Sequence, residues 1–312
     1  MIRQNITRAD CLKILNLHAP ALKEMRNSKI VVVGGTGFAG AWISEMIAAL
    51  NDDFDYGISL KLISRTPENL SIIAPHLTRR ADITTLKADV RQLGNFPMDA
   101  NWIIHAAANP DIRLHASKPL ETASVIADGT YSVIRIAERL SELKKVLYLS
   151  SGLVYGNDVS SEAGQSEADL GAPPLDASNI YANSKRFAET LCAAARVQSR
   201  IPVLVARPFS FIGPYQPLDT PWAQTTFLSD ALSGHAIRVL GDGQIIRSYL
   251  YGSDAAFWLL KIMVHGQPGD TVNVGSPTGI KIEDLAREIA RLRGVEQEVH
   301  HMVGGLERGV AQ

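Results

Sequence analysis

The stretch VVVGGTGFAG at residues 31–40 constrains the fold of this chain more than any other. A strongly apolar run leads directly into glycines at positions 34, 37 and 40 and then into a helical pattern. One glycine permits a tight turn, one lets the backbone approach a pyrophosphate, and one lets the helix pack on the strand. The first N–H groups of the helix would face the phosphates. The pattern predicts a dinucleotide site at Gly34, Gly37, Phe38, Ala39 and Gly40.

Short apolar runs alternate with longer helical patterns as far as residue 207. The runs lie at 29–34, 58–64, 84–89, 101–106, 145–150 and 202–207, and helix-like segments lie at 39–50, 121–143 and 178–198. Apolar runs of this length between helices are typical of buried parallel strands. We therefore predict an α/β fold of the Rossmann type, with a doubly wound parallel sheet.

The pattern loosens beyond residue 207, where prolines crowd 208–221 and shorter strand-like and helical pieces follow. We expect a helical extension at 1–28, an NAD(P)-binding Rossmann domain at 29–207 and a smaller α/β lobe, mainly for substrate, at 208–312. The chain has no low-complexity linker. We therefore expect the lobe to be interleaved with the Rossmann domain and not joined to it by a tether.

Composition limits the partners. Lysine and arginine total 31 against 32 acids, so no basic field indicates nucleic acid or an anionic membrane. No apolar run approaches the ~20 residues of a membrane span, and charges interrupt any signal-peptide core in the first 28 residues. Cys11 and Cys192 are too few for a disulfide scaffold or a cysteine zinc site. We expect a soluble, cytoplasmic protein without a metal.

The choice of dinucleotide depends on the end of the second apolar run. An acid there would bind a ribose 2′-hydroxyl, whereas an arginine accommodates a 2′-phosphate. The run ends in Ser64-Arg65-Thr66, with no acid before Glu68. Arg65 therefore favours NADP, with NAD kept open. Asp89, after the third run, is expected to contact the adenine, and we assign Val90 to the same cofactor site.

The segment YANSK places Tyr181 and Lys185 four residues apart on a helix, so that both project from one face. A phenol ordinarily has a pKa near 10, and an adjacent ammonium favours the phenolate. Such a tyrosine can act as general base on an alcohol while a hydride leaves for nicotinamide. Taken alone, this pair is a weak signal, because many such pairs are ordinary helix neighbours.

Eight motifs along residues 29–293 occur in an order that resembles the extended branch of the short-chain dehydrogenase/reductase superfamily. This branch is the NAD-dependent epimerase/dehydratase family of nucleotide-sugar epimerases, dehydratases and reductases. The motifs are GGTGFAG, ADV, HAAA, SSGLVYG, YANSK, ARPFSFIGP, RSYLYGSD and VNVGS. The resemblance implies an NAD(P)-dependent enzyme for a nucleoside-diphosphate sugar, and a homodimer formed through the helices at 121–143 and 178–198. It adds to the cofactor site Ala106, Ala107, Ala108, Tyr181, Lys185 and Pro208.

The resemblance also assigns the reacting groups. It implies that Ser151 hydrogen-bonds the sugar oxygen and that Tyr181 and Lys185 complete the catalytic set, whereas Ser150 is expected to bond the backbone. Relatives that dehydrate or decarboxylate usually carry an acid in the two positions after the catalytic hydroxyl. Here those positions are Gly152 and Leu153, and neither side chain can accept a proton.

On the substrate side, Arg247 stands where relatives place an arginine on the diphosphate, and a guanidinium suits phosphate oxygens. Ser210 stands where an asparagine commonly contacts substrate, and Ile126 replaces another asparagine. His105 is interpreted as a packed strand-end residue. Relatives continue past the last residues of this chain, which leaves the completeness of the substrate lobe open.

These residues predict hydride transfer at a sugar carbinol, either C4 epimerisation or reduction of a 4-keto nucleotide sugar. One alternative is a 4,6-dehydratase or decarboxylase that takes its base from elsewhere. Others are a non-catalytic NAD(P)-binding sensor and a reductase of a non-sugar carbonyl. The sequence leaves the base, the sugar and the stereochemical outcome open.

Overall fold

A computed structural model describes residues 2–156, 164–169, 171–294 and 299–302. Two compact units divide the chain. The first is Met1–Tyr215 with Leu250–Gly275, and the second is Gln216–Tyr249 with Ser276–Gln312. The chain therefore leaves the first unit at Tyr215 and returns to it at Leu250.

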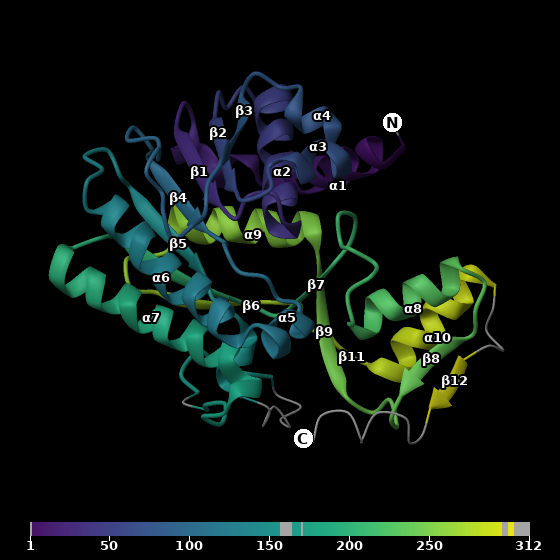
Figure 1. The fold of residues 1–312 in the computed structure, drawn as a ribbon. Helices are drawn as coiled ribbons and strands as arrows, with labels where there is room; N and C mark the ends of the chain where they lie inside the picture. Colours follow the sequence, from purple (N-terminus) through teal and green to yellow (C-terminus); the bar gives the residue numbers. More distant parts are fainter. Residues whose placement is uncertain (1, 157–163, 170, 295–298, 303–312) are drawn as a thin grey trace. The chain divides into compact units, whose positions relative to one another are not determined.

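The first unit contains a seven-stranded sheet in the order β10-β6-β5-β4-β1-β2-β3, in which every pairing is parallel (Figure 1). The strands are β1 Lys29–Val33, β2 Ser59–Ser64, β3 Ile83–Lys87, β4 Trp102–His105, β5 Lys145–Leu149, β6 Val203–Pro208 and β10 Thr271–Val274. The direction of winding reverses between β1 and β4, where an open parallel sheet ordinarily binds its ligand. This topology confirms the predicted Rossmann-type fold.

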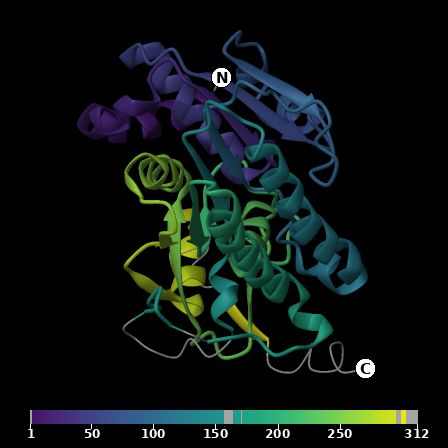
Figure 2. The same ribbon diagram turned by 90° about the vertical axis from the view of Figure 1, so that its left-hand side faces the viewer.

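Side chains of the strands alternate between two cores. Val31 and Val33 pack toward α6 (Pro119–Ala137) and α7 (Ile180–Ser199), which run side by side (Figures 1 and 2). Val32 packs on the opposite face, toward α2 (Phe38–Phe54) and α9 (Gly252–His265). Both faces are covered because consecutive residues of a strand point in opposite directions.

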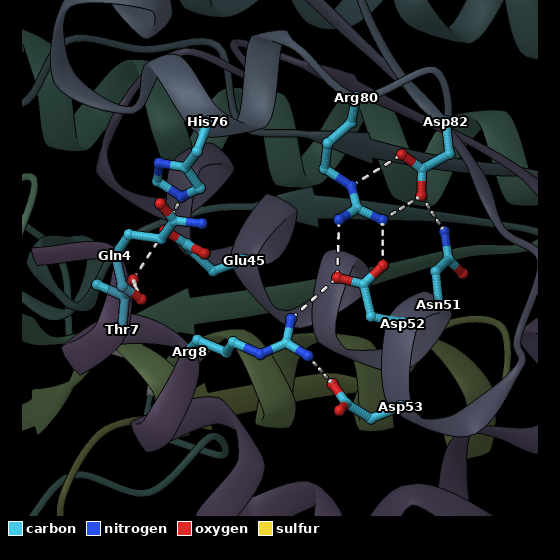
Figure 3. Close-up of polar contacts among 10 residues, drawn as sticks. All are labelled: Gln4, Thr7, Arg8, Glu45, Asn51, Asp52, Asp53, His76, Arg80 and Asp82. Carbon is cyan, nitrogen blue, oxygen red and sulfur yellow. Dashed lines mark hydrogen bonds and ion pairs between the residues drawn. The ribbon is translucent and has the colours of Figure 1, made fainter. Parts of the chain in front are cut away.

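The N-terminal extension forms α1 (Ile2–His18) and the 3-10 segment η1 (Ala19–Met25), which pack on α2 and α9. Figure 3 shows its polar contacts with α2: Thr7 Oγ1 donates to Glu45 at 2.9 Å, and Arg8 bonds Asp52 at 2.9 Å. The Tyr251 hydroxyl donates to Asp10 at 2.8 Å. Cys11 is fully buried. The extension is therefore part of the first unit's core.

The remaining elements of the first unit are short: α3 Glu68–Ile73, α4 Pro75–Thr78, α5 Ile112–Ser117, η2 Gly152–Tyr155, η3 Ala177–Asn179 and β7 Ser210–Ile212. The predicted helix over 121–143 corresponds to α6, which ends earlier, at Ala137. Within the described ranges, no helix is long and apolar enough to cross a membrane.

The second unit has a small core of its own between α8 (Ala223–Leu232), β8 (Ile237–Leu240) and α10 (Ile282–Arg293). Its other strands are β11 Gly279–Lys281, β12 Val299–Met302 and the first part of β9 (Ile246–Tyr251), whose last two residues belong to the first unit. β8 pairs with β12, and β9 pairs with β11. The turn at residues 241–243, between β8 and β9, therefore does not join two strands that pair with each other. Instead, the Gly243 carbonyl accepts a hydrogen bond from the Glu283 amide at 3.0 Å, so this turn contacts the first turn of α10.

Candidate active site

The glycine turn after β1 packs tightly at two of its three predicted positions. A Cβ on Gly34, whose φ is +85°, would lie 2.6 Å from the Ala107 nitrogen, and one on Gly40 would lie 2.2 Å from the Gly35 carbonyl oxygen. Gly37 differs, because its φ is −83° and its nearest neighbour would be the Gly34 oxygen at 3.7 Å. Internal packing therefore requires Gly34 and Gly40, whereas Gly37 leaves open space beside the turn.

The open space at Gly37 fits a pyrophosphate. Gly37 precedes α2, and no side chain of the described residues caps the first amides of this helix, including those of Phe38 and Ala39. Uncapped amides at a helix N-terminus bind phosphate well. The Ala106 nitrogen donates to the Val33 oxygen at 2.8 Å, which places the small residues after β4 beside the same turn. Ala107 and Ala108 pack against the core under α6 and α7.

Arg65 lies beside an acid from another element. Its Nη1 is 3.4 Å from Glu121 Oε1 in the first turn of α6, and the other oxygen of Glu121 is 3.5 Å from Lys118 Nζ. All three side chains line a cavity of about 230 Å³, together with Asn109, Leu114, Thr122, Val125 and Ile126. Arg65, which is predicted to favour a 2′-phosphate, thus has a second cation, Lys118, and one carboxylate, Glu121, beside it.

Asp89 is engaged within the protein. Its Oδ1 accepts from Arg91 Nε at 2.9 Å and its Oδ2 from Nη2 at 2.6 Å, and these hydrogen bonds lower the pKa of Asp89 to about 2. An adenine contact would share this carboxylate with Arg91. Val90 is 6% exposed, and its side chain packs directly on Gly129 of α6.

The structure brings Ser151, Tyr181 and Lys185 together. Ser151 follows β5 and caps η2, its Oγ accepting from the Leu153 amide at 3.2 Å. Tyr181 stands in the first turn of α7, and the Ser151 side chain is close enough to lower the pKa of its phenol. Lys185 Nζ lies 5.7 Å from the centre of the Tyr181 ring. The carboxyl ends of β1, β4 and β5 share one edge of the sheet, so the glycine turn and Ser151 do as well.

Burial dominates the electrostatics of this group. It raises the pKa of Tyr181, and the nearby Ser151 side chain lowers it. Burial also lowers the pKa of Lys185 to about 7, against the carboxylate of Glu189, which raises it. Lys185 Nζ donates to the Leu149 carbonyl at 2.6 Å. Ser151 is therefore the neighbour that opposes the effect of burial on the phenol, a role that the sequence assigned to Lys185.

Glu189 and Arg207 form an ion pair beside these residues that sequence reasoning missed. Ser150 Oγ donates to Glu189 and not to the backbone as expected, and Glu189 accepts from Arg207 Nε at 3.0 Å and Nη2 at 2.7 Å. Arg207 Nη1 also donates to the Tyr155 hydroxyl at 2.8 Å. Glu189 stands one turn after Lys185 on the same helix, and this spacing was the available signal.

The two positions after Ser151 carry no proton acceptor. Leu153 is 51% exposed. A Cβ on Gly152 would lie 2.9 Å from the Phe209 ring, so a larger residue at position 152 requires that ring to move. Position 152 thus carries no acid, and the Phe209 ring leaves no room for one.

The other predicted residues are placed as follows. Pro208 ends β6 and is opposite Val274 of β10, and Ser210 is half-buried in β7. Arg247 belongs to the second unit, where its Nη1 donates to the Ile246 carbonyl at 3.1 Å. His105 is buried with its Nε2 3.0 Å from Thr130 Oγ1, and burial lowers its pKa to about 3. No cluster of three metal-ligating side chains occurs among the described residues.

Comparison with known proteins finds relatives over most of this chain. UDP-glucuronic acid decarboxylase 1 of Xenopus tropicalis is 26% identical over 279 residues, which cover 89% of this chain and 63% of the frog protein. The human dTDP-D-glucose 4,6-dehydratase is 25% identical over 281 residues, covering 85% of this chain and 73% of that protein. The chain thus spans less than two thirds of the frog relative's length.

A solved structure of similar fold is the UDP-glucuronic acid 4-epimerase of Bacillus cereus in complex with NAD. Its TM-score is 0.73 at 20% identity, with 88% of this chain and 86% of that chain covered. At this identity the likeness supports the fold alone. The family model for the NAD dependent epimerase/dehydratase family matches residues 30–275. This match spans the sheet, the glycine turn and the Ser151–Tyr181–Lys185 group, and the chain accordingly belongs to the NAD dependent epimerase/dehydratase family.

Proposed function

We propose that the protein transfers a hydride at a carbinol carbon of a nucleoside-diphosphate sugar, either in C4 epimerisation or in reduction of a 4-keto sugar. The observation that carries this proposal is the group of a buried phenol, a half-buried primary hydroxyl and a buried ammonium at the sheet edge that also holds the glycine turn. The lack of a carboxylate at positions 152 and 153 favours these two reactions over elimination of water or loss of carbon dioxide.

In this proposal the phenolate of Tyr181 accepts the proton of the sugar hydroxyl, and the phenol returns it in the reverse step. Ser151 donates a hydrogen bond to the same sugar oxygen, and Lys185 supplies positive charge near the phenolate. A bound nicotinamide supplies the chemistry of accepting or returning the hydride. Gly37, with the uncapped amides of Phe38 and Ala39, would hold the pyrophosphate.

The cavity beside Arg65 is the proposed site of the adenosine ribose. Arg65 and Lys118 favour the 2′-phosphate of NADP, whereas Glu121 opposes it. The Bacillus cereus structure that contains NAD supports NAD. We keep both cofactors in the proposal, to be separated by titrating cofactor-free protein with each, by calorimetry.

For the substrate, we propose the second unit as the substrate lobe, in which Arg247 binds the diphosphate. For assembly, we propose a homodimer through α6 and α7. Two aromatic side chains on these helices, Tyr131 and Phe187, are 55% and 53% exposed. A partner helix that covered both rings would remove a substantial apolar area from water.

Decarboxylation or 4,6-dehydration is the second candidate, because the frog and human relatives carry those names. It requires a base outside positions 152 and 153. A third possibility, an NAD(P)-binding sensor without turnover, is disfavoured because a sensor has no need of the buried Tyr181 and Lys185.

The deciding experiment incubates the protein with UDP-, dTDP-, GDP- and CDP-sugars and with 4-keto sugars, each with NAD and with NADPH. Consumption of NADPH identifies a reductase, and product isomers without net cofactor change identify an epimerase. A 4-keto-6-deoxy or decarboxylated product contradicts the proposal. Tyr181→Phe is expected to abolish turnover and to leave cofactor binding within about twofold, and a variant that still turns over would refute Tyr181 as the base.

A further inference from the structure

A histidine that the sequence did not single out lies flat against Tyr181. The His115 and Tyr181 rings are stacked, with centroids 4.5 Å apart and planes 16° apart. His115 comes from α5, between β4 and α6, and is only 6% exposed. Aromatic pairs attract one another beyond the area they bury, and the attraction depends on ring geometry. The contact therefore restrains the orientation of the Tyr181 ring.

The imidazole is itself held in place. His115 Nε2 is 2.8 Å from the Asn109 carbonyl oxygen, and because a carbonyl only accepts, Nε2 carries the proton and donates. Asn109 directly follows the three alanines that come after β4. The start of α5 is fixed as well, since Asp111 caps it by accepting from the Arg113 amide at 2.9 Å. The ring that faces Tyr181 is thus anchored to the edge of the sheet.

Tyr181 has to present its hydroxyl in one direction. The Ser151 side chain is close enough to lower the pKa of the phenol, and the Lys185 ammonium lies 5.7 Å from the ring centre. A ring free to tilt would meet Ser151 less often, and misplacing a reacting group slows the chemical step more than it weakens binding. A flat neighbour at 4.5 Å restrains that tilt.

We propose that His115 is a positioning residue for Tyr181, which holds the phenol in the plane where its hydroxyl meets Ser151 and the sugar oxygen. This inference rests on the proposed function, in which Tyr181 is the base. His115 acts through its aromatic face and its anchor to Asn109, and it exchanges no proton with substrate.

Two substitutions of His115 separate this role from simple filling of space. His115→Leu fills a similar volume but has neither the flat face nor the bond to Asn109, whereas His115→Phe keeps the face and loses only the bond. We expect His115→Leu to lower kcat roughly 3- to 10-fold. We expect the KM for the sugar and the Kd for the cofactor to stay within about twofold, and His115→Phe to recover most of kcat. His18→Leu, which removes a histidine contact with Phe257 at 5.7 Å, is the matched control and should retain full activity.

A second measurement does not depend on turnover. In protein with 13C-labelled tyrosine, the signal that disappears in Tyr181→Phe identifies Tyr181. His115→Leu should move and broaden that signal, and His115→Phe should leave it sharp. Unchanged kcat and an unchanged signal in His115→Leu would overturn the proposal, as would a His115→Phe variant no better than His115→Leu. If Tyr181→Phe itself retains activity, the proposed function fails, whatever the His115 variants do.

Discussion

The glycine turn offers a test of the cofactor site that does not depend on any sugar. Gly37 and Gly40 both belong to the predicted motif, but they differ in how much room the structure leaves for a side chain. A Cβ at Gly37 meets its nearest atom at 3.7 Å, an ordinary contact, and the backbone there (φ −83°, ψ −176°) suits any residue. A Cβ at Gly40 meets the Gly35 oxygen at 2.2 Å. We therefore expect Gly37→Ala and Gly40→Ala to fail in different ways.

For Gly40→Ala, the contact is over 1 Å shorter than the van der Waals contact that starts at 3.4 Å, and the atoms that the new Cβ meets belong to the Gly35 backbone. Overpacking of this kind costs about 1–3 kcal/mol or more, and the better helix propensity of alanine offsets roughly 1 kcal/mol. For Gly37→Ala, the loss of a favourable N-cap residue and the reduced freedom of the unfolded chain nearly cancel. We expect the free energy of unfolding to fall clearly for Gly40→Ala and to change by less than about 0.5 kcal/mol for Gly37→Ala.

Cofactor binding should show the opposite sensitivity for Gly37. A methyl group in the space proposed for the pyrophosphate should cost about 1–3 kcal/mol, or roughly 5- to 150-fold in Kd. Urea unfolding of the cofactor-free proteins gives the first quantity, and calorimetric titration with NAD and NADP gives the second. A Gly37→Ala protein that binds both dinucleotides as tightly as the parent would refute the assignment of this space to phosphate, and a Gly40→Ala protein of parental stability would refute the packing argument.

Three further predictions concern a partly buried ion pair, a buried lysine and an exposed aromatic ring. Glu189→Ala leaves Arg207 and Ser150 without their carboxylate and should lower the free energy of unfolding by about 3 kcal/mol in urea titrations. Glu189→Gln loses the charge but keeps an acceptor, and it should cost about half as much. Equal effects of the two substitutions would show that the retained acceptor contributes nothing. The pKa of Lys185 falls from 10.5 to about 7 on folding, so the unfolded chain binds more protons than the folded chain between these two pH values. The free energy of unfolding should therefore rise with pH across that range by a few kcal/mol. Lys185→Met should remove this rise, and a rise that persists in the variant would have to come from another group. Phe187→Glu should shift a homodimer to monomer in sedimentation, with Leu175→Glu, at a residue 94% exposed, as the control that stays dimeric; a Phe187→Glu protein that remains dimeric would place the interface elsewhere.

Much of the first unit was predictable because its signals are local. Each strand is a run of apolar residues, and the turn after β1 announces itself by glycines whose spacing reflects backbone sterics. Tyr181 and Lys185 share a helix face through their spacing of four. The course of the chain between β6 and β10 was less predictable, since a turn such as that at 241–243 does not say which strands will pair.

The sequence by itself determined the parallel sheet, the dinucleotide turn and the tyrosine–lysine pair, because these depend on residues within a few turns of one another. Only the tertiary structure decided that His115 lies flat on Tyr181, that Glu121 of α6 reaches Arg65 after β2, and that Arg207 of β6 pairs with Glu189 of α7. Each of these contacts joins different elements. Their formation depends on how the helices settle on the sheet and on which rotamers the resulting space allows, and no spacing along the chain encodes that.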